Sequence, residues 1–402
     1  MTRTTSEQTR QWQGPAILSL GLRPFFLLAA LWAAVAMMAW VAMLSGGLNL
    51  PTRFDPVAWH AHEFLFGYVG AVVAGFLLTA VPNWTGRLPV VGWRLAGLVL
   101  IWGLGRGAVA VSEFLPAGAV IAADVLFLVV LWLVVLREIL AGRSWSNLPV
   151  LALVGVLIFA NLVFHLEAAN GDNAAQGYGF RLGLSVILVL ITLIGGKIIP
   201  SFTRNWLVKQ NQTDLPVPPM QRFDKITIVA TVATLLIWSV VPDLAVTGVA
   251  LVAVAGLHTK RLLRWKGGLV KAEPLLWVLH LAYAFLPLGA VLNGVAILAP
   301  DVMPQTTALH VWTAGAIGLM TVGVMTRAAL GHSGRPLHAG TPTTLIYLML
   351  VGSVITRVVV DLLPEFSMAL LQVSALLWVG SFAGFALVYG ALLIRPKVEN
   401  GT

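Results

Sequence analysis

Apolar stretches of about twenty residues alternate with short polar segments along almost the whole chain. A helix needs roughly 20 apolar residues to cross a bilayer, so each stretch predicts a membrane-spanning helix. Twelve such helices are predicted, at residues 24–44, 59–82, 92–112, 116–137, 148–168, 180–201, 222–241, 243–263, 272–298, 306–329, 342–362 and 365–394.

No stretch long enough for a soluble domain remains between these helices. The expected architecture is an all-α polytopic membrane protein, in which residues 1–402 form a single integral membrane domain. Residues 1–20 are expected to form a cytoplasmic N-terminal segment. The first apolar stretch exceeds a signal-peptide core and no small-residue cleavage site follows it, so we expect this helix to be retained.

Composition supports the membrane assignment and excludes several classes of protein. Hydrophobic residues make up 58% of the chain and charged residues 10%, against about 25% charged in a soluble domain. A water-soluble enzyme and a nucleic-acid-binding protein are excluded on this ground. The chain has no cysteine, which excludes disulfides, zinc–thiolate sites, iron–sulfur clusters, blue copper and covalently attached c-type haem.

The net charge of +9 reports orientation in the membrane. Twenty of the 25 basic residues fall on the side that holds both termini, and cytoplasmic loops collect Lys and Arg. Both termini are therefore predicted to be cytoplasmic. The segment from Lys260 to Lys271 is expected to be a solvated cytoplasmic loop that faces anionic lipid.

Several ionisable residues do not follow this sorting. Arg106, Lys197 and Arg357 lie within predicted spans, as do Glu63 and Asp124, and charges at that depth are costly unless they are paired or functional. Together with Arg181, which lies in an outer loop, Arg106 and Arg357 are expected near the outer face. They are candidates to bind carboxylates such as haem propionates. The alternative is pairing with Glu63, Glu167 or Asp361, or snorkelling to the interface.

Four histidines are predicted near the outer ends of three spans, namely His60, His62, His165 and His310. Imidazoles at one depth suit iron or copper, whereas each one alone is more typical of a polar residue bonded to the backbone. In an α-helix, His60 and Glu63 share a face and His62 lies almost opposite. One helix is therefore expected to serve two sites.

A second group of histidines is predicted on the cytoplasmic half. His280 and His332, with Lys197 and Arg327 nearby, are candidates for a second cofactor, or for plain loop structure around Arg327. Gly331 and Gly334 flank His332, which places it on a loop or a helix end. His258 and His338 are expected to be structural.

An internal repeat is predicted from glycine spacing. Gly67, Gly70, Gly75, Gly86 and Arg87 follow His62 at the same intervals at which Gly315, Gly318, Gly323, Gly334 and Arg335 follow His310, an offset of 248 residues. Small residues on one face allow close approach of helices. The sixth span is proposed as a third, weaker copy, because its Pro-aromatic-Thr end resembles that of the second span. The competing explanation is that such residues simply terminate helices at the interface.

The most specific motifs are those around the second, sixth and tenth spans. They are His60-Ala61-His62-Glu63, Gly75 to Gly86, Gly195-Gly196-Lys197-Ile198-Ile199-Pro200-Ser201-Phe202-Thr203-Arg204-Asn205, and Gly323 to Arg335 with its Gly331-His332-Ser333-Gly334 core. Through these motifs nearly the whole chain resembles the NnrS family. The resemblance implies a bacterial inner-membrane protein that contains haem and copper and is linked to denitrification and nitric oxide tolerance. Lys197 departs from it, because arginine is expected there in many relatives.

The leading functional hypothesis is a protein with haem b and copper that binds nitric oxide near the outer face and reduces or sequesters it. His60, His62, His165 and His310 are the expected metal ligands and Glu63 the expected proton donor. Reduction would also need an electron donor, a quinol or a cytochrome. The alternatives are a sensor that binds the metal without turnover and a twelve-span secondary transporter.

Overall fold

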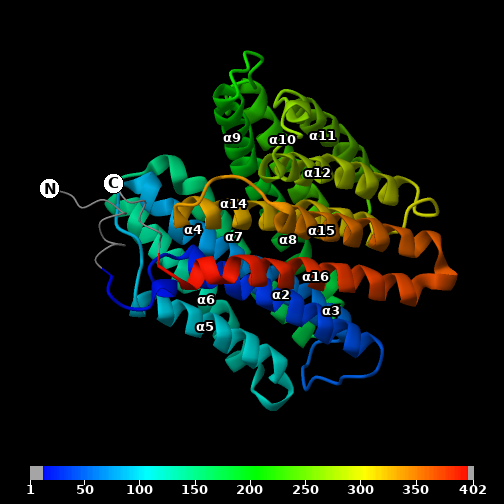
Figure 1. Ribbon diagram of the computed structural model, residues 1–402. Helices are drawn as coiled ribbons and strands as arrows, with labels where there is room; N and C mark the ends of the chain where they lie inside the picture. The colour runs from blue at the N-terminus through cyan, green and yellow to red at the C-terminus, as the bar shows by residue number, and fades with distance from the viewer. Residues whose placement is uncertain (1–11, 397–402) are drawn as a thin grey trace. The chain divides into compact units, whose positions relative to one another are not determined.

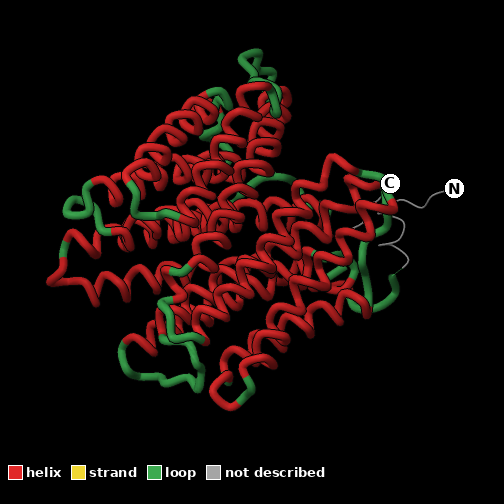
Figure 2. Tube along the Cα trace, turned by 180° about the vertical axis from the view of Figure 1, so that it is seen from behind, coloured by secondary structure: helices red, strands yellow, loops and turns green. Residues whose placement is uncertain are grey.

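The computed structural model describes residues 12–396, and all regular structure in that part of the chain is helical (Figure 2). All of the α-helices given below except α13 are labelled in Figure 1. Their bounds are α2 (Leu22–Leu44), α3 (Pro56–His62), α4 (Val69–Thr85), α5 (Trp93–Ala110), α6 (Ala117–Ala141), α7 (Leu148–Ala169), α8 (Tyr178–Leu190), α9 (Gly196–Lys209), α10 (Arg222–Val240), α11 (Ala245–Leu263), α12 (Pro274–Leu298), α13 (Gln305–His310), α14 (Leu319–Ser333), α15 (Thr341–Val359) and α16 (Ser367–Ile394).

Eleven helices among the described residues are long and apolar enough to cross a membrane. The remaining predicted span, 92–112, is present as α5, an 18-residue helix that carries Arg94 and Arg106. The multi-pass membrane architecture is thereby confirmed. The largest difference in bounds is the end of the sixth span, since α9 continues to Lys209 rather than residue 201.

Local chemistry accounts for where the helices begin and end. The Asp55 carboxylate accepts hydrogen bonds from the backbone N–H of Val57 and Ala58, at 2.9 and 3.0 Å, and Pro56 occupies the first helical turn. Both features are typical of a helix N-terminus. At the other end of the same span, Gly86 adopts a φ of +66° that ends α4, a conformation glycine reaches without steric cost.

Three spans contain a π-helical segment. These are η2 (Glu63–Tyr68) between α3 and α4, η6 (Ile191–Gly195) between α8 and α9, and η8 (Val311–Gly318) between α13 and α14. Such widened turns often occur at functional sites. η2 begins directly after His62 and η8 directly after His310, the two histidines that anchor the predicted repeat; the repeat itself stays a prediction.

The chain divides into two compact units. Unit 1 comprises Met1–Gly183, Ala328–Pro336 and Phe382–Thr402, and unit 2 comprises Leu184–Arg327 and Leu337–Ser381. Within unit 1, α4 packs on α2 and α6, and the Arg23 guanidinium at the start of α2 donates to the backbone oxygens of Leu393 and Arg395, at 3.1 and 2.6 Å. Within unit 2, α11 packs along α12.

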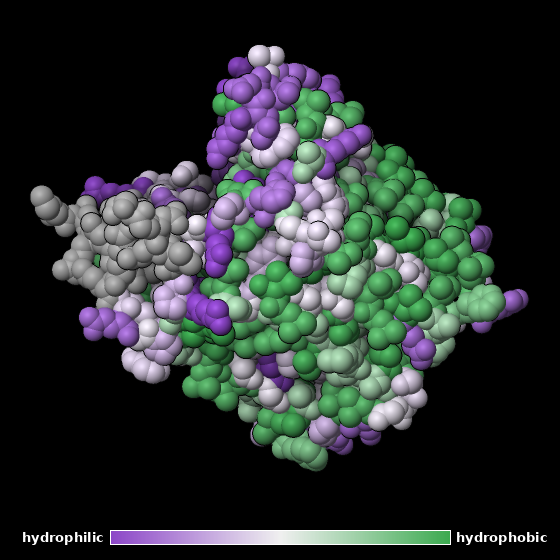
Figure 3. Space-filling model, in the orientation of Figure 1, coloured by the Kyte–Doolittle hydropathy of each residue, from purple (hydrophilic) through white to green (hydrophobic). Residues whose placement is uncertain are grey.

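Glycines allow the close packing in both units. A Cβ on Gly75 would lie 2.7 Å from the ring of Phe26 in unit 1, and one on Gly323 would lie 2.9 Å from Leu279 in unit 2. Many outward side chains, in contrast, are large and apolar, such as Leu387 at 82% exposure, and apolar side chains cover much of the surface seen in Figure 3. Such a surface suits contact with lipid.

The expectation of a solvated loop from Lys260 to Lys271 was wrong. Helix α11 continues to Leu263, Arg261 is fully buried and Trp265 is 2% exposed. Arg261 pairs with Asp224 of α10 at 2.8 Å, which offsets the cost of burying either charge. The prediction failed because the sequence shows only a run of basic residues. It does not show that one of them, Arg261, is buried and paired while the lysines near it are exposed.

Residues 1–11 of the expected N-terminal segment lie outside the described residues. Of its remainder, Leu18 and Leu20 are buried, and the Leu18 carbonyl accepts a hydrogen bond from the Gly92 N–H at 2.8 Å. This part of the segment is therefore packed against the start of α5 in unit 1.

Candidate functional site

A buried cluster of polar side chains lies within unit 1, surrounded by apolar helices. Its members come from five spans: Trp32 of α2, His62 and Glu63 at the junction of α3 and η2, Arg106 of α5, Asp124 of α6, and Asn161 and His165 of α7. We call these seven residues the central cluster. Its position inside membrane-spanning helices makes each charged member costly unless the others compensate it.

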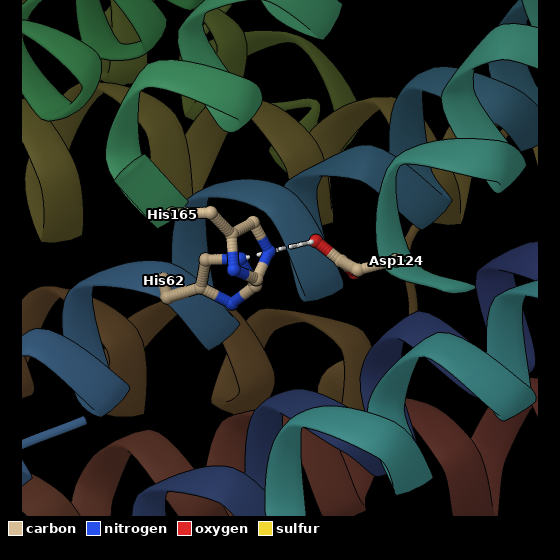
Figure 4. Close-up of side chains that lie close together, drawn as sticks. All are labelled: His62, Asp124 and His165. Carbon is tan, nitrogen blue, oxygen red and sulfur yellow. Dashed lines mark hydrogen bonds and ion pairs between the residues drawn. The ribbon is translucent and has the colours of Figure 1, made fainter. Parts of the chain in front are cut away.

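Two imidazoles and one carboxylate meet at the middle of this cluster. His62 Nε2 lies 3.1 Å, and His165 Nε2 2.9 Å, from the same oxygen of Asp124 (Figure 4). One ligand atom from each of the three residues lies within 4.8 Å of the others. Two imidazoles and a carboxylate are a donor set that copper, iron and zinc accept.

The Asp124 carboxylate is the hub of the hydrogen-bond network. Its Oδ2 also accepts from Asn161 Nδ2 at 2.8 Å, and its Oδ1 accepts from Arg106. Asn161 Oδ1 in turn lies 3.1 Å from His62 Nε2. A carboxylate that accepts several such bonds is held in one orientation.

Glu63 forms the second half of the cluster. Its Oε1 accepts from Arg106 Nη1 at 2.6 Å and lies 3.1 Å from His62 Nδ1, while its Oε2 accepts from Trp32 Nε1 at 2.8 Å. The backbone approaches closely here, because a Cβ on Gly67 would lie 2.7 Å from Arg106 and 2.9 Å from Glu63. Glycine at this position leaves the space that the ion pair occupies.

Counting formal charges, the central cluster holds two carboxylates against a single guanidinium. His62 and Glu63 are fully buried, and Arg106 and Asp124 almost so. Both ring nitrogens of His62 face carboxylate oxygens, yet a neutral imidazole carries a single N–H. A further positive charge, carried by a cation or by a second proton on His62, would complete the balance.

Aromatic rings enclose the two histidines. Phe54 lies 5.1 Å from the His62 ring and 5.4 Å from the His165 ring, measured between centroids, and Phe164 lies 5.3 Å from His62. The two imidazoles themselves are 4.9 Å apart. The space between them suits a single ion and is too narrow for a porphyrin ring.

The expected division of faces in the second span was wrong. His62 and Glu63 both enter the central cluster, whereas the His60 ring stacks on Trp40 at 4.3 Å and contacts Phe64 at 4.5 Å. The prediction assumed a regular α-helix with 100° per residue, but the π-helical segment begins at Glu63. His62 and Glu63 are neighbours about 100° apart around the helix, and the long Glu63 side chain reaches back to His62 Nδ1, at 3.1 Å, and to Arg106.

His310 and Arg357 lie in unit 2 and have their own surroundings. His310 Nδ1 contacts the Thr306 carbonyl at 2.7 Å. The Arg357 guanidinium pairs with Asp361 at 3.5 Å, and the Thr307 hydroxyl donates to the same carboxylate. Arg106 and Arg357 thus have the carboxylate partners that the sequence offered as the alternative to haem propionates; a propionate-binding role stays a prediction.

The remaining predicted residues do not join the central cluster. Arg181 donates to the Gln176 carbonyl and lies over the Tyr178 ring at 4.9 Å. Lys197 and His332 are exposed. His280 is buried in unit 2, where its Nε2 pairs with the Thr203 hydroxyl at 2.8 Å.

Sequence reasoning placed His62, Glu63, Arg106 and His165 among the functional residues but gave Asp124 no ligand role. A carboxylate in the apolar first half of the 25-residue helix α6, far from Glu138 near its end, was the available signal. Trp32 and Phe54 were missed, since nothing distinguishes them from other aromatic residues at a membrane interface.

The chain was compared with known proteins. No protein with a curated function matches it. The family described as NnrS protein matches residues 16–397, a range that includes all seven residues of the central cluster. Because the match extends over nearly the whole chain, the protein belongs to the NnrS family.

Proposed function

We propose that this protein is a bacterial inner-membrane metalloprotein that binds nitric oxide and reduces or sequesters it, with copper held by His62, Asp124 and His165. The NnrS family is associated with nitric oxide-related function. The observation that carries the proposal is the convergence of three ligand atoms within 4.8 Å in a fully enclosed site.

The surroundings of His62 support metal binding. Its Nδ1 faces Glu63 at 3.1 Å while its Nε2 faces Asp124. Histidines that ligate a metal commonly donate the other ring N–H to a carboxylate, so Glu63 would orient His62 while Nε2 binds the ion. An ion at Nε2 also supplies the positive charge that the two carboxylates and Arg106 leave unbalanced.

Copper fits this cluster, and haem does not fit between its two imidazoles. Copper at this site would supply a redox-active centre with a coordination position for nitric oxide. Haem b, which the family resemblance implies, would need an imidazole elsewhere. His60, His280, His310 and His332 remain the proposed candidates for that role, with Arg181, Arg357 and Lys197 as candidates for its carboxylates.

The residues of the chain would contribute to the chemistry in distinct ways. Nitric oxide is small and uncharged, so it can reach the site through lipid and past Phe54 and Phe164, which exclude water. Reduction of two nitric oxide molecules consumes two electrons and two protons. Glu63, ionised at rest, would take up and pass on protons beside the site, and Arg106 would keep both carboxylates in place between transfers.

Metal analysis of purified variants tests this proposal. Changing His62 or His165 to Ala should lower the copper content at least tenfold, whereas His60→Ala, two residues from His62 but outside the cluster, should retain it. Equal copper in all variants, or none in the wild type, would overturn the assignment.

A nitric oxide electrode then separates catalysis from sequestration. Turnover with an electron donor that is lost in the His62 variant supports reduction. Stoichiometric uptake without turnover supports sequestration. Absence of both uptake and turnover would reject the nitric oxide role and leave the secondary transporter.

A further inference from the structure

A second buried polar network lies in unit 2, and the proposed metal site makes no use of it. Tyr283 of α12 is fully buried, and its hydroxyl lies 2.8 Å from His258 Nδ1 and 3.0 Å from Arg261 Nη1, both on α11. His258 is also fully buried. A tyrosine hydroxyl bonded to an imidazole at this depth requires an explanation, because either residue could be replaced by an apolar one at lower cost.

The partners fix the direction of every hydrogen bond in the network. Thr231 donates its single hydroxyl hydrogen to the Thr227 carbonyl at 2.7 Å, so its oxygen must accept from His258 Nε2–H, 2.8 Å away. A neutral His258 therefore presents an unprotonated Nδ1 to Tyr283. Arg261 has only donors, so Tyr283 accepts from Arg261 and donates its O–H to His258.

We propose that Tyr283 is a redox-active tyrosine, and that His258 takes its phenolic proton when the ring loses an electron to a one-electron oxidant of the nitrogen dioxide class. In the step, nitrogen dioxide gains one electron and becomes nitrite. Tyr283 loses that electron together with its O–H proton, which moves to His258 Nδ1, and a neutral tyrosyl radical remains. This inference does not rest on the metal proposed for unit 1, although its choice of oxidant rests on the proposed nitric oxide role.

The surroundings favour a reversible transfer. The distance of 2.8 Å between the phenol oxygen and Nδ1 is short enough for direct proton movement. Arg261 is paired with Asp224 at 2.8 Å and donates to the phenol oxygen. Reduction of the radical gives a phenolate, which is a stronger base than imidazole, so the proton returns from His258 to Tyr283. The Trp265 ring, 4.5 Å from the Tyr283 ring, offers a second aromatic group to share the electron deficiency.

The oxidant has access to this place. Nitric oxide and oxygen both concentrate in lipid and combine there to nitrogen dioxide, which is itself small and uncharged. Helix α11 is exposed on the side next to this network, where Gly256 is exposed and Leu263 is 74% accessible. A protein that handles nitric oxide in a membrane meets this oxidant next to its own helices.

The whole purified protein in detergent, exposed to dilute nitrogen dioxide without excess nitric oxide, tests the proposal. Electron paramagnetic resonance should detect a neutral tyrosyl radical, and peptide mass spectrometry should find 3-nitrotyrosine at Tyr283, formed when the radical captures a second nitrogen dioxide. Tyr283→Phe, which preserves the ring, should remove the radical. Tyr347→Phe is the matched control, since Tyr347 is equally buried in unit 2 but its hydroxyl pairs with Thr326 at 2.5 Å.

A second variant tests whether His258 accepts the phenolic proton. His258→Gln should slow radical formation about 100-fold, the range expected on loss of a general base, and the solvent deuterium isotope effect of the wild type should fall. Ring-deuterated tyrosine, incorporated without any substitution, should narrow the radical signal even if a variant fails to fold. A signal that ring deuteration leaves unchanged, one that survives in Tyr283→Phe, or one that forms equally fast in His258→Gln would overturn the proposal.

Discussion

Asp124 shows how much one side chain determines in a membrane-spanning protein. Its two oxygens accept hydrogen bonds from Arg106 and Asn161 and contact both His62 and His165. Each of those partners is itself buried, so none can turn to water instead. The carboxylate therefore sets the positions of three other helices relative to α6 within unit 1.

Replacing Asp124 by Asn tests its structural role and its ligand role together. The amide keeps the shape but removes the charge that faces Arg106, and breaking a buried ion pair costs about 3–5 kcal/mol. We expect a lower midpoint of thermal unfolding in detergent together with loss of bound copper. Glu138→Gln removes a buried carboxylate of the same helix whose partners, Arg87 and Arg137, are largely exposed.

Comparing the Asp124→Asn and Glu138→Gln variants decides whether Asp124 is a metal ligand in the central cluster. The Glu138 variant should keep its copper and lose less stability, because an ion pair open to water contributes about 0–1 kcal/mol. Full copper occupancy in Asp124→Asn would remove this carboxylate from the ligand set.

At the scale of elements, the π-helical segment η2 begins inside the central cluster, since Glu63 is its first residue and His62 directly precedes it. Within this segment, the Gly67 carbonyl accepts a hydrogen bond from the Trp102 indole at 3.0 Å. A sequence pattern could not predict this, because a π-turn has no composition of its own and hydrophobic periodicity assumes 3.6 residues per turn throughout.

Gly67→Ala tests the packing of this element. The new Cβ would lie 2.7 Å from Arg106 Nη1, 2.9 Å from Glu63 Oε2 and 3.0 Å from Trp32 Nε1, so the ion pair must move. Overpacking of this kind costs about 1–3 kcal/mol, and displacement of Glu63 should also weaken copper binding through His62.

Gly70→Ala, three residues further along, is the matched control, since the nearest atom to its Cβ is 3.9 Å away. It should leave unfolding and copper content unchanged. Equal behaviour of the two variants, measured by thermal unfolding and metal analysis, would show that the close approach at Gly67 has no role in the site.

At the scale of the whole molecule, the sequence was sufficient to predict the helices but not the contacts between them. Apolar length predicted every span because the bilayer imposes one length on each. The hydrogen-bond partners of Arg106, Arg261 and Tyr283 could not be predicted in the same way. They depend on which helices pack together and on how far each helix is shifted along its neighbour. For that reason, the sorting of charges placed Arg261 in a solvated loop. Whether a basic residue is exposed or buried can be predicted only when the residues that pack against it are known.

Orientation in the membrane is the remaining prediction at this scale, and the absence of cysteine makes it directly testable. Single cysteines can be introduced at Asp301, between α12 and α13, and at Gln212, between α9 and α10, both of which are exposed. The distribution of positive charge predicts that Asp301 faces the periplasm and Gln212 the cytoplasm.

A maleimide that crosses the outer but not the inner membrane should therefore label only the Asp301→Cys variant in intact cells, and both variants after the cells are lysed. Labelling of Gln212→Cys alone in intact cells would invert the topology, whereas labelling of both would show that the two loops lie on the same side and that the number of crossings between them is even.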